Sequence, residues 1–403
     1  MAITTVKILL RYALLALAIP TTIYFGILGL VMAVPGLETH ALYLHRVRLT
    51  WFKDHNIPET FGFLHNQVTP FSIETADGEI LHAWHVLPLM FYHRHEKELL
   101  AQPSGFAHDF SNRLSFKLLR DDPDARLVIY LHGTAGCLAS GYRPDSYRAL
   151  YSTAPDKIHI VTVDYRGYGL SSGTPSEAGL LLDALALTTW ATNIAGIPTS
   201  RIVIFAQSLG TAVAISLLDE LSAQSSAPSF VGTVLVAPFS DVSTLTATYR
   251  IGGVIPVLSP LSLFPPLLTF YNGFLKSTWR SKDRIARFVK RRESEENSAN
   301  YYLTLIHAQD DTTIPSIHTE VLYWHAVNAT TPTGISYEEL EQEKAMSRTD
   351  LGPGGWAMEW QTKKGVIREE LLTYGAHDRL GAYPSIAMAV FRAFQNTDPA
   401  FGG

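Results

Sequence analysis

The sequence predicts an α/β fold in which helices cover both faces of a mostly parallel central sheet. Short, nearly continuous apolar runs alternate with helical stretches, and Asp77-Gly78 marks a hairpin ahead of them. The runs are Leu127–Leu131, Ile158–Val163, Ile202–Phe205, Val231–Ala237 and Tyr302–His307, and helices are expected near residues 144–153, 176–196, 208–223 and 384–395.

Length and composition indicate one enzyme domain with additions. The chain has 403 residues, a hydrophobic share of 47% and a formal net charge of −5. These values exclude disorder for the bulk of the chain and give no basic excess for nucleic acid. The single cysteine, Cys137, excludes an intramolecular disulfide framework and a cysteine-rich metal site. The composition leaves the oligomeric state open.

The first 36 residues are expected to anchor the chain in a membrane. Tyr12–Val34 is a run of 23 residues without a charged side chain. At 1.5 Å per residue this run is long enough to cross a hydrocarbon layer of about 30 Å. A secretory signal peptide and a buried helix are the alternatives. Basic residues flank the run on both sides, so charge alone does not orient it.

The rest of the chain is expected to divide into a connector, residues 37–67, and a catalytic domain, residues 68–403. Polar and apolar positions alternate through Val68–Pro88, as they do in an antiparallel strand pair. Residues 89–125 are polar and are expected to be irregular.

Ser208 has the sequence context of a nucleophile. The run Ile202–Phe205 leads through Ala206, Gln207 and Ser208 into a helical stretch. In such a strand–turn–helix, the residues two before and two after the serine must be small, because strand and helix otherwise collide. Ala206 and Gly210 meet this requirement.

The segment L-H-G-T-A-G, residues 131–136, is the candidate oxyanion loop. The backbone N–H groups of Thr134 and Leu209 could stabilise an oxyanion, with Ala135 as the alternative to Thr134. The glycines would also suit an ordinary turn. We expect His132 to be a structural hydrogen-bonding residue rather than a general base.

A serine nucleophile needs a base, and a carboxylate that orients the base. Asp310 and Asp311 follow the run Tyr302–His307, and His377 follows the strand-like run Val366–Tyr374. Both positions lie at expected strand ends, where open α/β sheets place their sites. His377 is the candidate base, and both aspartates are candidates for the acid.

Together the motifs resemble those of the membrane-anchored lysophosphatidylserine lipase and monoacylglycerol lipase branch of the α/β-hydrolases. They are L-H-G-T-A-G at 131–136, D-Y-R-G-Y-G at 164–169, G-T-P-S-E at 173–177, Q-S-L-G-T at 207–211, A-P-F at 237–239 and H-A-Q-D-D-T-T-I-P at 307–315. The match covers most of residues 68–240 and 300–325, plus the final histidine region. The resemblance implies an α/β-hydrolase fold with Ser208, Asp311 and His377 as catalytic residues. It favours Asp311 because the family's acid precedes Ile/Val-Pro at this spacing.

The chain departs from the family's pattern in two places. Ala206-Gln207 stands where the family usually has Gly-His. Residues 327–365, which hold Trp356 and Trp360, look like an insertion between acid and histidine. This insertion forms either part of the pocket wall or a surface loop.

Residues 238–300 lie where such enzymes have a cap. The stretch from Ile251 to Leu275 is rich in Pro, Leu and Phe. We expect it to accept an acyl chain or to touch the bilayer, with an ordinary core-packed lid as the alternative.

The resemblance implies hydrolysis of a single-chain lipid ester, such as a lysophospholipid or a monoacylglycerol, without a metal or cofactor. The expected partners are the lipid substrate and the bilayer. The resemblance also implies a single-pass anchor with the catalytic domain in the lumen of the endoplasmic reticulum. A peptidase or thioesterase of the same fold is one alternative, and a non-catalytic lipid-binding or scaffold protein is another.

Overall fold

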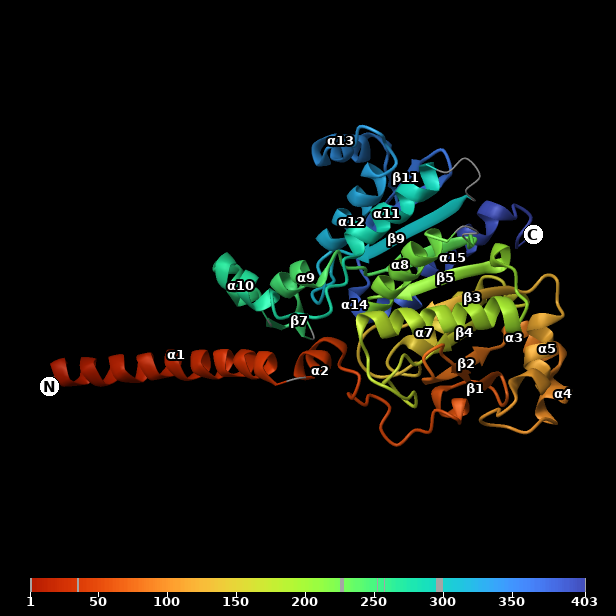
Figure 1. The fold of residues 1–403 in the computed structure, drawn as a ribbon, viewed down its shortest axis with the longest axis horizontal. Helices are drawn as coiled ribbons and strands as arrows, with labels where there is room; N and C mark the ends of the chain where they lie inside the picture. The colour runs from red at the N-terminus through yellow and green to blue at the C-terminus, as the bar shows by residue number, and fades with distance from the viewer. Residues whose placement is uncertain are drawn as a thin grey trace.

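The computed structural model describes residues 2–34, 36–224, 228–251, 253–256, 258–294 and 300–402. In these residues a long N-terminal helix extends away from one α/β domain (Figure 1). The strands are β1 Val68–Glu74, β2 Ile80–Val86, β3 Arg126–Leu131, β4 Ile158–Val163, β5 Ile202–Gln207, β6 Gly232–Val236, β7 Arg250–Ile251, β8 Ile255–Pro256, β9 Tyr301–Ala308, β10 Thr349–Asp350, β11 Gly355–Gln361 and β12 Gly365–Leu372. The α-helices are α1 Ala2–Ala33, α2 Leu37–Tyr43, α3 Leu89–Arg94, α4 Glu96–Leu100, α5 Leu114–Arg120, α6 Arg143–Ser152, α7 Glu177–Thr189, α8 Leu209–Ser222, α9 Val242–Thr248, α10 Pro265–Asn272, α11 Ser281–Ser294, α12 Ile317–Asn328, α13 Tyr337–Ser347, α14 Ala376–Arg379 and α15 Pro384–Thr397.

The central sheet of the described residues has the strand order β1-β2-β4-β3-β5-β6-β9-β12-β11-β10. Neighbouring strands from β4 to β12 run parallel, and antiparallel strands continue the sheet at both edges. The parallel strands alternate with helices along the chain, so the predicted fold class is confirmed.

Both faces of the sheet are covered, which explains the nearly continuous apolar runs. Helices α7, α8, α11 and α12 pack on one face, and α6 and α15 pack on the other (Figure 1). Successive side chains of a strand point to opposite faces. In β5, Ile202 and Ile204 therefore point into the core on the side of α7 and α8. Val203 and Phe205 point into the core on the side of α6 and α15.

The expectation that residues 89–125 are irregular is wrong. This segment contains α3, α4 and α5. Tyr92 and Leu99 are buried there against Leu87, with Leu114 and Leu118 packed around them. The short helices are stabilised by this tertiary contact, because isolated helices of five to seven residues do not persist in water.

Residues 337–361 form a helix and two strands that extend the sheet. Helix α13 begins at a capping box in which Ser336 and Glu339 bind each other's backbone N–H groups. Strand β11 pairs with β12, and β10 pairs with β11 at the sheet edge. Lys344 of α13 ties this addition to the sheet through an ion pair of 2.8 Å with Glu369 of β12.

The segment 238–300 divides into two parts, and its residues 252, 257 and 295–299 lie outside the described range. Helix α11 packs against α8 and α12 and belongs to the layer that covers the sheet. Helix α10 and the β7–β8 hairpin project from the domain near the end of α1 (Figure 1), whereas α9 packs into the core through Val242 and Leu245. We call this projecting part, residues 249–276, the cap.

Helix α1 has no core of its own, but its last turns contact the cap. Thr4–Val31 is apolar and long enough to cross a membrane, and most of its side chains are exposed. Leu28 packs against Leu258 and Leu261 of the cap, with Tyr24 and Tyr271 beside them. An exposed apolar helix of this length is costly in water, so a bilayer is the environment that it fits.

We therefore predict that the full-length protein stays with membranes during alkaline carbonate washing. A variant with Leu15→Arg and Leu17→Arg should be released, because each charge at the centre of a spanning helix costs about 3 kcal/mol. Immunoblotting of pellet and supernatant measures the distribution. Recovery of the intact unmodified chain in the supernatant would contradict a spanning α1.

Candidate active site

Ser208 lies on a sharp turn between β5 and α8. Its backbone is left-handed, with φ 52°, and its N–H donates to the carbonyl oxygen of Val236 at 2.9 Å. A Cβ at Gly210 would lie 2.1 Å from the carbonyl oxygen of Leu131, so only glycine fits at this position. This close approach brings the start of α8 against the carboxyl end of β3. Both small residues that the sequence predicts, Ala206 and Gly210, are buried in the turn.

His377 lies on α14, after the end of β12, and its ring faces Ser208. The Nε2 atom is 2.9 Å from Ser208 Oγ. The backbone around His377 is held from two sides. Gln207 Nε2 donates to its carbonyl oxygen at 2.9 Å, and Asp310 Oδ1 accepts from the N–H of Ala376 at 2.8 Å.

Asp311, rather than Asp310, faces the His377 ring. Its Oδ2 atom lies 2.7 Å from His377 Nδ1. Its Oδ1 atom accepts from the N–H groups of Thr313 and Ile314, each at 2.9 Å. Two backbone donors therefore fix the carboxylate through one oxygen, and its second oxygen faces the His377 imidazole.

His307, at the end of β9, contacts the same carboxylate from the other side. Its Nε2 atom is 3.2 Å from Asp311 Oδ2 and 2.8 Å from the carbonyl oxygen of Ile314. Because a carbonyl can only accept, Nε2 carries the proton and donates. Nδ1 lies 2.6 Å from Thr319 Oγ1. His307 is thus a donor that holds the carboxylate.

The electrostatics of the pair follow from these contacts. Burial alone would raise the pKa of Asp311, but hydrogen bonds from His307 and His377 outweigh it and hold that pKa well below its usual range. Burial alone would lower the pKa of His377, but the hydrogen bond and charge of Asp311 raise it above 6.5. The ionised carboxylate thus makes the imidazole a stronger base.

The segment after β3 packs directly against Ser208. A Cβ at Gly133 would lie 3.2 Å from Ser208 Cβ. The N–H of Ala135 donates to the carbonyl oxygen of Tyr43 at 3.2 Å. Within the described part of the chain, the N–H groups of Thr134 and Leu209 have no such acceptor. Of the two alternatives, Thr134 is therefore the residue with a free donor.

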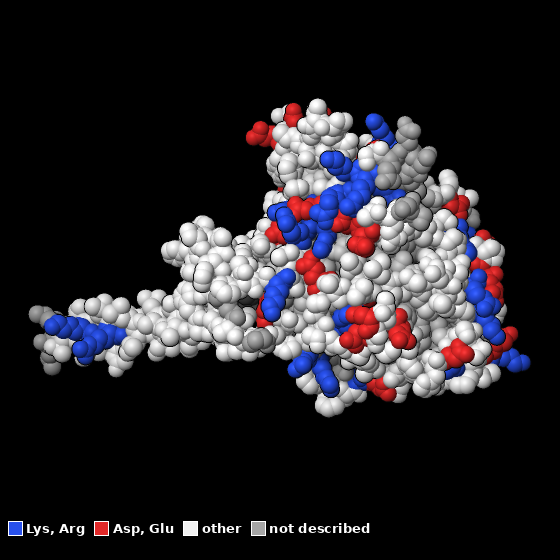
Figure 2. Space-filling model, viewed as in Figure 1, with Lys and Arg blue, Asp and Glu red and all other residues white. Residues whose placement is uncertain are grey.

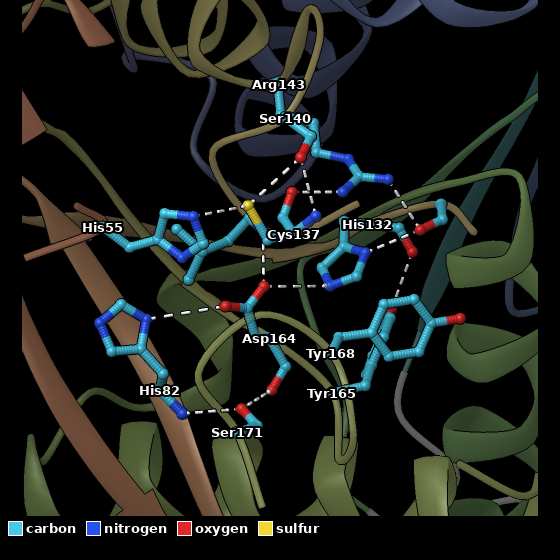
Figure 3. A network of polar contacts seen from close by, with 12 residues as sticks. His55, His82, His132, Cys137, Ser140, Arg143, Asp164, Tyr165, Tyr168 and Ser171 are labelled. Atoms are coloured by element: carbon cyan, nitrogen blue, oxygen red, sulfur yellow. Dashed lines mark hydrogen bonds and ion pairs between the residues drawn. The ribbon is translucent and has the colours of Figure 1, made fainter. Parts of the chain in front are cut away.

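Arg143 holds this loop by its carbonyl groups. Nη2 donates to the carbonyl oxygens of Gly133, Thr134 and Ala135 at 2.9, 3.0 and 2.9 Å, and Nη1 donates to that of Cys137. Figure 3 shows Arg143 on one side of the loop, with the polar network around Asp164 on the other. Since the carbonyls turn toward the guanidinium, the loop cannot flip its peptide groups freely.

His132 is part of that network, and among the described residues its ring has no hydrogen bond to Ser208 or His377. Its Nδ1 is 2.7 Å from the carbonyl oxygen of Gly133, and burial lowers its pKa to about 3. Asp164 accepts from the N–H of Leu138 at 2.6 Å and so fixes the far end of the loop. Gly169, in the same D-Y-R-G-Y-G motif as Asp164, is required because a Cβ there would lie 1.9 Å from Asp164 Oδ2.

Sequence reasoning did not assign roles to His307, Gln207 or Arg143. His307 lies in the motif H-A-Q-D-D-T-T-I-P and Gln207 in the motif Q-S-L-G-T. Their positions near the candidate acid and the candidate nucleophile could therefore have indicated their roles. Arg143 had no such signal, because its partners are backbone carbonyls.

Within the described ranges, no group of three His, Cys, Asp or Glu side chains could hold a metal ion. The arrangement offers a hydroxyl, a proton acceptor and two free N–H donors, which are the parts needed for acyl transfer.

Comparison with known proteins gives consistent matches. The model of the alpha/beta hydrolase family matches residues 128–358. Lysophosphatidylserine lipase ABHD12 of Rattus norvegicus is 26% identical over 331 residues, which cover 82% of this chain and 72% of that protein. Protein ABHD12B of Homo sapiens is 29% identical over 208 residues, half of each chain. Among solved structures, an alpha-beta hydrolase from Vibrio vulnificus has a TM-score of 0.49 at 16% identity and covers 85% of this chain and 87% of its own.

The raised pKa of His377 predicts an acid limb in the pH profile. His377 must be neutral to accept the serine proton, so kcat/KM should fall about tenfold per pH unit below that pKa. Asp311→Asn removes the charge that raises it. The limb should then move to lower pH, and the plateau should fall by about 10⁴-fold. The measurement is kcat/KM for a soluble ester from about pH 4 to pH 9. An unmoved limb in folded Asp311→Asn protein would contradict the assigned contact.

Proposed function

Because this chain belongs to the alpha/beta hydrolase family, we propose that it is a serine hydrolase that cleaves the acyl ester of single-chain lipids. One observation carries the proposal: Ser208 Oγ, the His377 ring and Asp311 form a continuous hydrogen-bonded chain, with distances of 2.9 and 2.7 Å. Acyl transfer through Ser208 to water is the chemistry that such a chain supports.

In the proposed reaction His377 Nε2 takes the Ser208 proton as Oγ attacks the ester carbonyl. Asp311 accepts the Nδ1–H, which keeps Nε2 free to act as the base. The N–H groups of Thr134 and Leu209 stabilise the tetrahedral oxyanion. His377 then gives its proton to the leaving alcohol. Water releases the acyl group from Ser208 by the same steps, with His377 again as base.

The proposed substrate is a lysophospholipid or a monoacylglycerol. The similarity to a lysophosphatidylserine lipase supports a lipid ester. The apolar cap supports it independently, because Leu263, Phe264 and Phe270 are all exposed there. Figure 2 shows that the cap and the adjoining part of α1 present almost no charged side chains on this face.

The position of the cap along α1 supports contact with the bilayer. Leu28, which packs against the cap, lies three residues before Val31, the last residue of the stretch Thr4–Val31 that could cross a membrane. At 1.5 Å per residue this is about 4.5 Å from the end of the stretch. The exposed phenylalanines of the cap would then lie at the boundary of the hydrocarbon layer. A single-chain lipid could reach the domain there without leaving the bilayer.

We predict that Ser208→Ala lowers turnover of lysophosphatidylserine and of a monoacylglycerol by about 10⁴-fold or more, because no other nucleophile is proposed. Ser152→Ala, on the exposed end of α6, is the matched control and should keep full activity. Melting temperatures of both variants check folding. Retained turnover in folded Ser208→Ala would contradict the nucleophile. Faster hydrolysis of thioesters or peptides than of lipid esters would contradict the substrate class.

We also propose that α1 is a single-pass anchor with the catalytic domain on the lumenal side of the endoplasmic reticulum. A protease added to sealed microsomes should then spare residues 40–403, and detergent should expose them. Proteolysis is a better readout than glycosylation, because Asn328 of the Asn328-Ala329-Thr330 sequon is half-buried and its Oδ1 accepts from Ile335 N–H. Digestion of the domain without detergent would show the opposite orientation.

A further inference from the structure

Helix α2, which follows the membrane anchor, is hydrogen-bonded to the candidate oxyanion loop. The carbonyl oxygen of Tyr43, its last residue, accepts from Thr134 Oγ1 at 2.7 Å and from Ala135 N–H at 3.2 Å. It also accepts from Tyr168 Oη at 2.7 Å. Tyr43 is 1% exposed, so water does not compete for these contacts. Three donors thus converge on one buried acceptor.

The same helix is fixed at a second place in the domain. Glu38 Oε1 accepts from the N–H groups of Lys276 and Ser277, at 2.8 and 3.3 Å. Tyr43 Oη donates to Ser277 Oγ at 2.9 Å. Helix α2 therefore bridges the end of the cap and the loop beside Ser208, and its position does not depend on the loop alone.

The loop conformation needs such support. Ala135 has φ 60°, a left-handed conformation that is rare for a residue with a side chain. Arg143 holds the carbonyl side of the loop, and Tyr43 holds the other side. With the N–H of Ala135 bound to Tyr43, the N–H of Thr134 is left free, and it follows Gly133, which packs against Ser208.

We propose that α2 is a positioning element of the active site, which keeps the Thr134 N–H directed at the oxyanion. The inference rests on the proposed serine-hydrolase function. A loosened loop would stabilise the tetrahedral oxyanion less, while the acyl chain would bind elsewhere as before. The expected signature is therefore a lower kcat at an unchanged KM.

The test uses the full-length chain and changes the contact from both sides. Thr134→Val removes the hydroxyl that donates to Tyr43. Glu38→Ala removes the acceptor at the other end of α2, and Glu38→Gln keeps a side-chain oxygen. Tyr168→Phe removes the remaining side-chain donor to Tyr43. Thr134→Val, Glu38→Ala and Tyr168→Phe should each lower kcat about 3- to 10-fold, as expected for one lost hydrogen bond. Glu38→Gln should stay within about twofold.

A second readout separates positioning from folding. A trifluoromethyl ketone forms a tetrahedral adduct with the serine, so its affinity should fall by the same factor as kcat in each impaired variant. Wild-type kcat in both Thr134→Val and Glu38→Ala would overturn the inference. A lower kcat/KM together with a lower melting temperature and an unchanged affinity for the ketone would also overturn it. Ser208→Ala tells the two proposals apart, since retained turnover there contradicts the nucleophile itself, whatever the α2 variants do.

Discussion

The close approach between the first turn of α8 and the carboxyl end of β3 is the constraint on which the site depends. Gly210 permits it, since any larger residue would meet the carbonyl oxygen of Leu131. The approach places the N–H of Leu209 beside the loop that carries Thr134. Ser208, one residue before this turn of α8, has a left-handed backbone with φ 52°. Strain of this kind persists only where the surroundings hold it, and here buried strands on both sides supply that support.

The carboxylate of Asp311 shows how a buried charge is kept ionised. Two backbone N–H groups bind one oxygen, and two imidazoles bind the other. Together they outweigh the cost of burial, which alone would favour the protonated acid. The charge in turn sets the tautomer and basicity of His377. The hydrogen-bonded series His307, Asp311 and His377, from β9 to α14, thus raises the basicity of the imidazole that faces Ser208.

The sequence was sufficient where the signal is local or periodic. The apolar runs around Ile129 and Ile204 predict the parallel strands β3 and β5, because side chains on both faces of these strands are apolar. The structure brings Ser208, Asp311 and His377 within hydrogen-bonding distance, each at a strand end where the sequence placed it. The helices within 89–125 were missed, because tertiary packing stabilises them rather than a long apolar period. The link from Tyr43 to the loop was missed, because a backbone carbonyl leaves no mark on composition or spacing.

The bridge made by α2 also bears on how the chain folds while it is synthesised. Thr134 follows Tyr43 by 91 residues, and Lys276 follows Glu38 by 238 residues. At about 5 to 20 residues per second, α2 leaves the ribosome roughly 12 to 48 seconds before Lys276 does. Helix α1 can enter a bilayer during that interval. The contact between Glu38 and Lys276 is therefore made late in synthesis, and Asp311 and His377 of the candidate active site follow it later still.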